Sequence, residues 1–96
     1  MAIAFSTESR QDLREIATYI LRDSPIRALS FTEELEARCL SLVEHPDRGA
    51  LRERLLKGLR FLPHGSYNIF YRHENGDIQI MRIMHGARRL KRKDFA

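Results

Sequence analysis

Arginine, tyrosine and histidine residues in the second half of the chain could together act on a phosphodiester. The set comprises Arg60, Tyr71, Arg82 and His85. Arginine side chains neutralise phosphate oxygens, and histidine exchanges a proton near neutral pH. Cutting RNA needs both, because charge develops on the scissile phosphate while protons move at the 2′-hydroxyl and the leaving oxygen. These residues are therefore a candidate RNA-cleaving set.

A structural role is the alternative for the same residues. Arg82 would pair with a carboxylate at a sheet edge, and His85 would cap the end of a strand. The residue types alone favour this structural role over catalysis, because each residue also has an ordinary place in a small sheet.

Other kinds of chemical site find little support in the sequence. The histidines, at positions 45, 64, 73 and 85, include no pair spaced three or four residues apart, and Cys39 has no cysteine partner. We therefore expect no metal site and no cofactor. Cys39 lies on an apolar helical stripe, which favours a small buried side chain over a nucleophile. The sequence also has no glycine-rich phosphate loop.

Charge is divided unevenly between the two halves of the chain. Residues 1–48 hold 6 Arg and 9 Asp or Glu, and residues 49–96 hold 11 Lys or Arg and 4 Asp or Glu, so the net charges are −3 and +7, which sum to +4. The densest basic stretch is residues 88–93. It is either a solvated tail that aids solubility or a surface for an acidic partner, whether nucleic acid or protein.

The first half of the chain predicts a short strand followed by two helices. Residues 3–5 are apolar, and apolar residues then recur at helical spacing between Leu13 and Leu21. Ser6, Thr7 and Ser9 are candidate N-caps, and Ser9 with Asp12 resembles a capping box. A second helix begins at residues 24–25 and ends before residues 45–49. The short join predicts an antiparallel helical hairpin.

The second half of the chain predicts strands. The candidates are residues 59–62, 67–72 and 78–85, with an Asn-Gly hairpin turn at residues 75–76. Strict alternation along the last strand would place Ile78, Ile80, Arg82 and Met84 on one face, and Gln79, Met81, Ile83 and His85 on the other. The predicted fold is α+β, in the order β-α-α-β-β-β. An antiparallel sheet packs against the helical hairpin, and a short basic tail or helix follows.

Composition bounds the class of protein. With 96 residues, 43% hydrophobic and 31% charged, the chain suits one globular domain spanning residues 1–96. No apolar run approaches the roughly 20 residues that span a membrane. The first residues turn polar too early for a signal peptide, and a single cysteine suits a reducing compartment, so we expect a cytoplasmic protein without membrane contact.

Several motifs, in order along nearly the whole chain, resemble ParE toxins of the RelE/ParE superfamily. They are Ser6-x-x-Ser9-x-x-Asp12-Leu13-x-x-Ile16-x-x-Tyr19-Ile20; Ser24-Pro25 with Ala28-x-x-Phe31; Pro46-x-x-Gly49-x-x-Arg52; Gly58-Leu59-Arg60; Gly65-x-Tyr67-x-Ile69-x-Tyr71-Arg72; and Ile78-x-Ile80-x-Arg82-Ile83-x-His85-Gly86-Ala87-Arg88. The resemblance implies the same α+β fold.

The superfamily has two functional branches, and the resemblance implies one of them. RelE-like members cut mRNA on the ribosome, whereas ParE-like members inhibit DNA gyrase and are not known to cut RNA. The RNase branch typically has an arginine directly after the first tyrosine of its central strand, where this chain has Asn68. Many ParE-like chains end in His-x-x-Arg-Asp, where this chain has Arg89 after Arg88.

The resemblance therefore implies a non-enzymatic toxin that inhibits gyrase. We expect its target-contact surface to be basic, consisting of Arg82, His85, Arg88, Arg89, Lys91, Arg92 and Lys93. The alternative is a ribosome-dependent mRNA endonuclease in which Arg60 and Arg82 hold the phosphate and His85 moves the proton. A second alternative is a non-toxic family member that only binds an antitoxin.

All these readings share one partner, a ParD-like antitoxin in a hetero-oligomer. Operator DNA would be bound only indirectly, through the antitoxin. Exposed parts of Tyr19, Leu29, Leu40 and Leu62 are candidate receivers for an amphipathic antitoxin helix. Ordinary core packing is the alternative role for each of these side chains.

Overall fold

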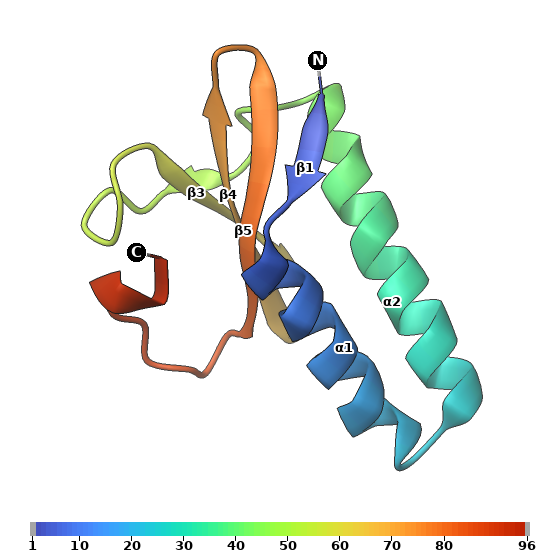
Figure 1. Cartoon of the computed structure of the whole chain (residues 1–96). Coiled ribbons are helices and arrows are strands. Elements are labelled where there is room, and N and C mark those ends of the chain that lie inside the picture. Colours follow the sequence, from blue (N-terminus) through green and yellow to red (C-terminus); the bar gives the residue numbers. More distant parts are fainter. Residues whose placement is uncertain (1, 96) are drawn as a thin grey trace.

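The computed structural model describes residues 2–95 and has the predicted α+β fold (Figure 1). Its elements in chain order are β1 (Ile3–Phe5), α1 (Thr7–Leu21), α2 (Pro25–Leu40), the 3₁₀ turn η1 (Ser41–Val43), β2 (Ala50–Leu51), β3 (Leu59–His64), β4 (Tyr67–Glu74), β5 (Asp77–His85) and the 3₁₀ turn η2 (Arg92–Phe95). Within this part of the chain, neither helix is both long and apolar enough to cross a membrane.

The sheet has five strands in the order β1-β5-β4-β3-β2. It is mixed rather than wholly antiparallel, because β1 runs parallel to β5 with Ile3 opposite Ile78. In sequence, the helical hairpin separates β1 from the other strands (Figure 1). This long connection allows β1 and β5 to run parallel. Strand β2 was not predicted, since two residues are too few to show a period.

Serine caps begin both helices. Ser6 Oγ accepts a hydrogen bond from the Ser9 backbone N–H at 3.0 Å, and Ser24 Oγ accepts one from the Arg27 N–H at 3.2 Å. The predicted start at Ser24-Pro25 is confirmed, with Pro25 in the first turn. Of the three candidate caps for α1, Ser6 is the one used. Asp12 takes no part in a capping box and instead lies buried against the sheet.

The main hydrophobic core lies between the helical hairpin and one face of the sheet. Its buried residues are Ile16, Phe31, Leu35, Cys39, Leu42, Leu62, Ile69, Tyr71, Ile78, Ile80 and Ile83. A smaller core lies among a second set of side chains, namely Leu59, Phe70, Met84 and Phe95. The strands therefore bury side chains on both faces, which explains why β5 reads as apolar near its centre on both faces.

A β-bulge breaks the alternation of β5. Phe70 on β4 lies opposite Arg82, while the next residue, Tyr71, lies opposite Ile80, so Met81 is an extra residue on β5. One inserted residue reverses the faces of all side chains after it. The predicted face of Ile78, Ile80, Arg82 and Met84 is therefore wrong beyond Ile80, because Ile83 joins the main core and Met84 the smaller one.

Candidate functional site

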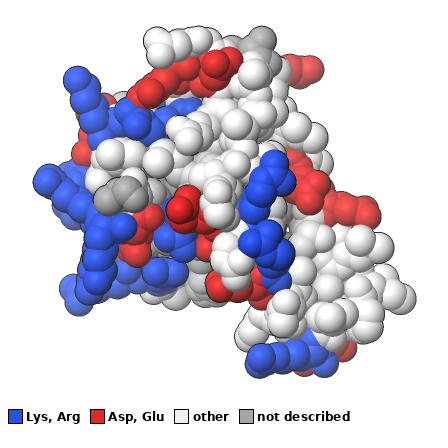
Figure 2. All heavy atoms as spheres, viewed as in Figure 1, with Lys and Arg blue, Asp and Glu red and all other residues white. Residues whose placement is uncertain are grey.

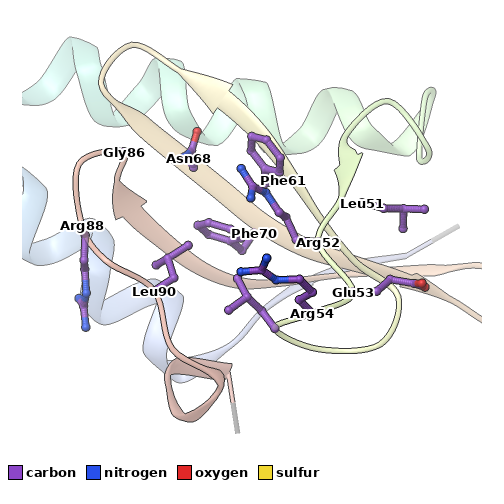
Figure 3. Close-up of a pocket in the computed structure, with 11 residues that line it drawn as sticks. Leu51, Arg52, Glu53, Arg54, Phe61, Asn68, Phe70, Gly86, Arg88 and Leu90 are labelled. Atoms are coloured by element: carbon purple, nitrogen blue, oxygen red, sulfur yellow. The ribbon is translucent and has the colours of Figure 1, made fainter.

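An open groove of about 470 Å³ lies between the connection from β2 to β3 and the segment that follows β5 (Figure 3). We call it the basic groove. Its lining residues are Leu51, Arg52, Glu53, Arg54, Leu55, Phe61, Asn68, Phe70, Gly86, Arg88 and Leu90. Leucine and phenylalanine side chains supply the apolar surface, and three arginines outnumber the single carboxylate. The groove therefore suits a ligand that is both anionic and apolar.

One wall of the groove combines arginine with aromatic surface. The Arg52 guanidinium lies over the Phe61 ring, 4.6 Å from its centroid, and the Phe61 and Phe70 rings are 6.1 Å apart. Figure 3 shows Arg52 and Arg54 on one side of the groove and Arg88 on the other, with Phe70 between them. Stacking on a ring holds a guanidinium in place while leaving its N–H groups free for an anion.

The opposite wall is formed by the segment after β5, which folds back on the sheet. Asp94 accepts hydrogen bonds from the Arg88 guanidinium at 3.2 Å and from the Lys91 backbone N–H at 2.9 Å. Phe95 is only 6% exposed and packs edge-on against Phe70, with the ring centroids 5.1 Å apart. The sequence left open a basic tail or a helix at this end of the chain. In the structure, residues 92–95 form a short 3₁₀ helix that docks on the sheet.

Basic residues from both walls form a continuous basic face. The segments touch, because Arg92 Nε donates to the Arg54 carbonyl oxygen at 3.0 Å. In Figure 2, blue Lys and Arg atoms crowd the side where Figure 1 places these two segments. The members of the basic face are Arg52, Arg54, Lys57, Arg88, Arg89, Lys91, Arg92 and Lys93. Such a surface attracts acidic partners and orients them on approach.

Arg82 lies in an ion pair between α1 and β5. Its guanidinium donates to both carboxylate oxygens of Asp12, at 2.8 and 2.9 Å, and to the Asp94 carbonyl oxygen at 3.2 Å. The hydrogen bonds with Asp12 raise the pKa of Arg82 above its usual value. Asp12 also accepts from the Ile83 backbone N–H at 2.9 Å. The pairing that the sequence offered as the structural alternative is the arrangement found here.

Arg60 is held by the loop after α2. Its guanidinium donates to the Gly49 carbonyl oxygen at 2.7 Å and to the Asp47 carbonyl oxygen at 3.2 Å. Beside it, the buried Tyr71 hydroxyl donates to the Pro46 carbonyl oxygen and accepts from the Gly49 N–H, both at 2.8 Å. Burial raises the pKa of Tyr71. Both side chains therefore fix this loop against the sheet.

His85 lies at the exposed end of β5. Its Nδ1 accepts a hydrogen bond from the Ala87 backbone N–H at 3.0 Å, and its ring packs edge-on against Tyr67 at 5.4 Å. This contact caps the strand end, as the structural alternative expected. Arg60, Arg82 and His85 therefore have separate hydrogen-bond partners in the structure.

The predicted antitoxin-contact residues divide into two groups. Tyr19, Leu29 and Leu40 are exposed at 64%, 64% and 53%, and lie on the helical hairpin. Leu62 is only 4% exposed and belongs to the main core, so it offers no surface to a partner. On β3, Leu62 lies opposite Ile69 of β4, and both side chains belong to the main core.

Sequence reasoning missed the basic residues that precede β3. Arg52, Arg54 and Lys57 lie in a connection that has no regular period, so no pattern tied them to the C-terminal basic stretch. Three basic residues within six positions were the one available signal. Among the residues described, no three metal-ligating side chains come together.

Comparison with known proteins places this chain in a family. A family model described as the ParE toxin of the type II toxin–antitoxin system parDE matches residues 3–90. The chain is 34% identical over 86 residues to Toxin RelE2 of Caulobacter vibrioides. The aligned region covers 90% of this chain and 96% of that protein.

Solved structures of toxin–antitoxin complexes share the fold. A structure titled as the chromosomal ParDE system from P. aeruginosa matches with a TM-score of 0.74 and 24% identity, over 88% of this chain and 95% of that one. The RelBE2 toxin–antitoxin complex from Mycobacterium tuberculosis matches with a TM-score of 0.58 and 25% identity, over the same shares of the two chains. The chain therefore belongs to the ParE toxin family of type II toxin–antitoxin systems.

Proposed function

We propose that this toxin acts by binding DNA gyrase and blocking its cycle, and that it does not itself cut RNA. The observation that carries the proposal is that the candidate catalytic residues are each held by a different hydrogen-bond partner. Arg60 and Arg82 are engaged with the loop after α2 and with Asp12, and His85 is engaged with its own strand end. Acid–base catalysis needs groups within hydrogen-bond reach of one reacting atom.

The basic face is our proposed gyrase contact. The predicted target-contact set was Arg82, His85, Arg88, Arg89, Lys91, Arg92 and Lys93. The basic face keeps its last five members and adds Arg52, Arg54 and Lys57 of the adjoining connection. Most of these side chains are exposed and several have no acidic partner among the described residues. Charges of this kind speed association and fix orientation, so inhibition should weaken as salt is raised.

We also propose an antitoxin partner of the ParD type. Exposed Tyr19, Leu29 and Leu40 on the helical hairpin support a docking surface for its helix, because an amphipathic helix buries spaced apolar anchors. We expect a cytoplasmic hetero-oligomer that reaches operator DNA only through the antitoxin.

The test measures supercoiling by purified gyrase in the presence of the purified toxin. The informative variant combines Arg89→Ala, Lys91→Ala and Lys93→Ala, which removes exposed charges without removing a side-chain contact described here. The control combines Arg14→Ala on α1 with Arg22→Ala at its C-cap, and so removes two positive charges far in sequence from the basic face. We expect the first variant to lose inhibition by about tenfold and the control to retain it, since each lost charge contributes a few tenths of a kcal/mol or more to association.

A parallel in vivo measurement separates the two branches of the superfamily. Incorporation of labelled thymidine and labelled methionine is followed in the first minutes after the toxin is induced alone. Loss of DNA synthesis before translation supports gyrase as the target. Early collapse of translation would refute the proposal.

The second candidate function is ribosome-dependent mRNA cleavage. It is supported by the relative named RelE2 and by the arginines of the basic groove, which could hold a phosphate backbone. On this reading, His85→Ala abolishes killing while leaving the fold intact, and primer extension on cellular mRNA detects cuts that the variant lacks.

A further inference from the structure

We propose that part of the basic face binds the phosphate backbone of duplex DNA. We call this part the outer ridge, and its members are Arg54, Lys57, Arg89, Lys91, Arg92 and Lys93. Contact with phosphates reads no base sequence, so recognition of an operator stays with the antitoxin. The choice of DNA as the natural duplex rests on the proposed function, because gyrase acts on duplex DNA, whereas the match of the ridge to duplex phosphates does not.

Three of these cations line a second hollow, of about 370 Å³, beside the basic groove. Its lining residues are Glu53, Arg54, Leu55, Leu56, Lys57 and Arg92. The Nε of Arg92 donates to the Arg54 carbonyl oxygen at 3.0 Å, and no partner within residues 2–95 takes the two terminal nitrogens of this guanidinium. A guanidinium that is held in place with free N–H groups suits the oxygens of a phosphate. The hollow is therefore the seat of one phosphate.

The positive charge of the ridge is not neutralised by the carboxylates near it. All six members are exposed, and within residues 2–95 the one ion pair of the basic face joins Arg88 to Asp94. The Asp94 side chain is only 11% exposed and also accepts from the Lys91 backbone N–H. Glu53 accepts from the Gly58 N–H at 3.4 Å, and three cations outnumber it in the hollow. The ridge therefore keeps its charge for an external anion.

The apolar side chains of the same segments are taken up by the smaller core. Leu55, Leu56 and Leu90 are half-buried against this core, and Phe95 is 6% exposed. Protein–protein interfaces bury aromatic and other apolar side chains at their centre and are poor in lysine, whereas protein–DNA interfaces are polar and positively charged. The ridge, which consists of cations and includes three lysines, therefore matches DNA better than it matches a protein.

The aromatic rings of the adjoining groove are already covered, which favours a duplex over a single strand. The Arg52 guanidinium lies over Phe61 at 4.6 Å, and Phe70 packs against Phe95 at 5.1 Å. Proteins that bind single strands stack the bases on exposed aromatic rings. In a duplex the bases are stacked on one another and the phosphates face outward, so a ridge of cations is enough.

The test measures how the binding of DNA to the full purified chain depends on salt. Fluorescence polarisation follows two labelled duplexes of unrelated sequence, each of about 20 base pairs, between about 50 and 200 mM salt. The logarithm of the binding constant should fall linearly with the logarithm of the salt concentration, by about 0.9 for each phosphate contact. Because the ridge has six cations, we expect a slope between about −3 and −5 and equal binding of the two sequences.

A pair of double variants tests the hollow. Arg54→Gln with Lys57→Gln removes two of its charges and keeps the Arg54 carbonyl oxygen that holds Arg92. This variant should bind more weakly, and the magnitude of its salt slope should fall by about 2. Arg14→Gln with Arg22→Gln removes the same charge from α1 and its C-cap and should leave the slope unchanged. Circular dichroism checks that both variants are folded.

Backbone amide shifts in NMR spectra of the unmodified chain give a test that depends on no variant. Shifts on addition of the duplex should concentrate in residues 54–57 and 89–93. Absence of duplex binding at the lowest salt, an unchanged slope in the Arg54→Gln and Lys57→Gln variant, or shifts confined to the helical hairpin would each overturn the proposal. Tighter binding of single-stranded DNA, duplex RNA or polyglutamate would also overturn it.

The outcome for gyrase is separate from the outcome for DNA. A toxin that binds duplex DNA without inhibiting supercoiling would support the outer ridge as a DNA site and refute the proposed function. A toxin that inhibits supercoiling without binding duplex DNA would support the proposed function and overturn the DNA site.

Discussion

Replacing Asp12 by alanine should destabilise this toxin by about 3 kcal/mol. The carboxylate accepts from the Arg82 guanidinium at 2.8 and 2.9 Å and from the Ile83 backbone N–H at 2.9 Å. Removing one partner of a buried ion pair costs about 3–5 kcal/mol, because the other charge stays buried. The Arg82 side chain is 17% exposed and keeps its bond to the Asp94 carbonyl oxygen, which places the loss near the lower limit.

Urea unfolding followed by circular dichroism measures this loss. With a denaturant slope of about 1–3 kcal/mol per molar for a small protein, the midpoint should fall by about 1–3 M. Asp12→Asn keeps an oxygen acceptor for the Ile83 N–H and should lose less. A change below about 0.5 kcal/mol for Asp12→Ala would refute the reasoning, because surface substitutions lie in that range.

The same pair of substitutions shows how Arg82 contributes to toxicity. If Arg82 contributes to killing only by stabilising the fold, Asp12→Ala and Arg82→Met should each reduce killing in proportion to the stability that they lose. The double variant should lose much less stability than the sum of the losses in the two single variants. Full stability with complete loss of killing in Arg82→Met alone would instead make Arg82 a direct contact.

Three further predictions follow from the buried groups. Burial raises the pKa of Cys39 to about 12, so the native thiol should stay unreactive toward iodoacetamide near pH 8 and should react once the chain is unfolded; a fast native reaction would contradict its burial. Gly49→Ala places a Cβ 2.8 Å from the Tyr71 hydroxyl and 2.7 Å from the Phe61 carbonyl oxygen, so thermal unfolding should show a loss of about 1–3 kcal/mol, and wild-type stability would show that the loop shifts freely. Phe95→Ala should cost about 3 kcal/mol in the same assay, because it removes a ring that is 6% exposed; a loss under about 1 kcal/mol would show that the turn is not docked.

The elements with a clear period were predictable from the sequence. The core stripe of α2 and the Asn75-Gly76 turn, with φ values of 52° and 79°, are confirmed. The bulge at Met81 was not predictable, because one extra residue in a strand that is apolar on both faces leaves no mark on the pattern. Because of this bulge, the prediction assigned Ile83 and Met84 to the wrong faces of the sheet.

The candidate site was less predictable than the fold. The Asp12–Arg82 pair joins residues 70 positions apart, and only the packed structure selects this carboxylate from the others on α1. The basic groove likewise combines the irregular connection before β3 with the segment after β5, which sequence position keeps apart. The distribution of charge along the sequence indicated that the second half of the chain is basic. The shape of the groove could not be predicted, because it depends on tertiary contacts.

The parallel pairing of β1 with β5 bears on how the chain folds as the ribosome makes it. Ile3 pairs with Ile78, which the ribosome adds 75 residues later. Strand β1 therefore stays unpaired until β5 has emerged. The helical hairpin likewise exposes its core stripe until the sheet arrives. Long-range pairing of this kind delays folding. The folded surface that a partner could recognise therefore forms only late in the synthesis of the chain.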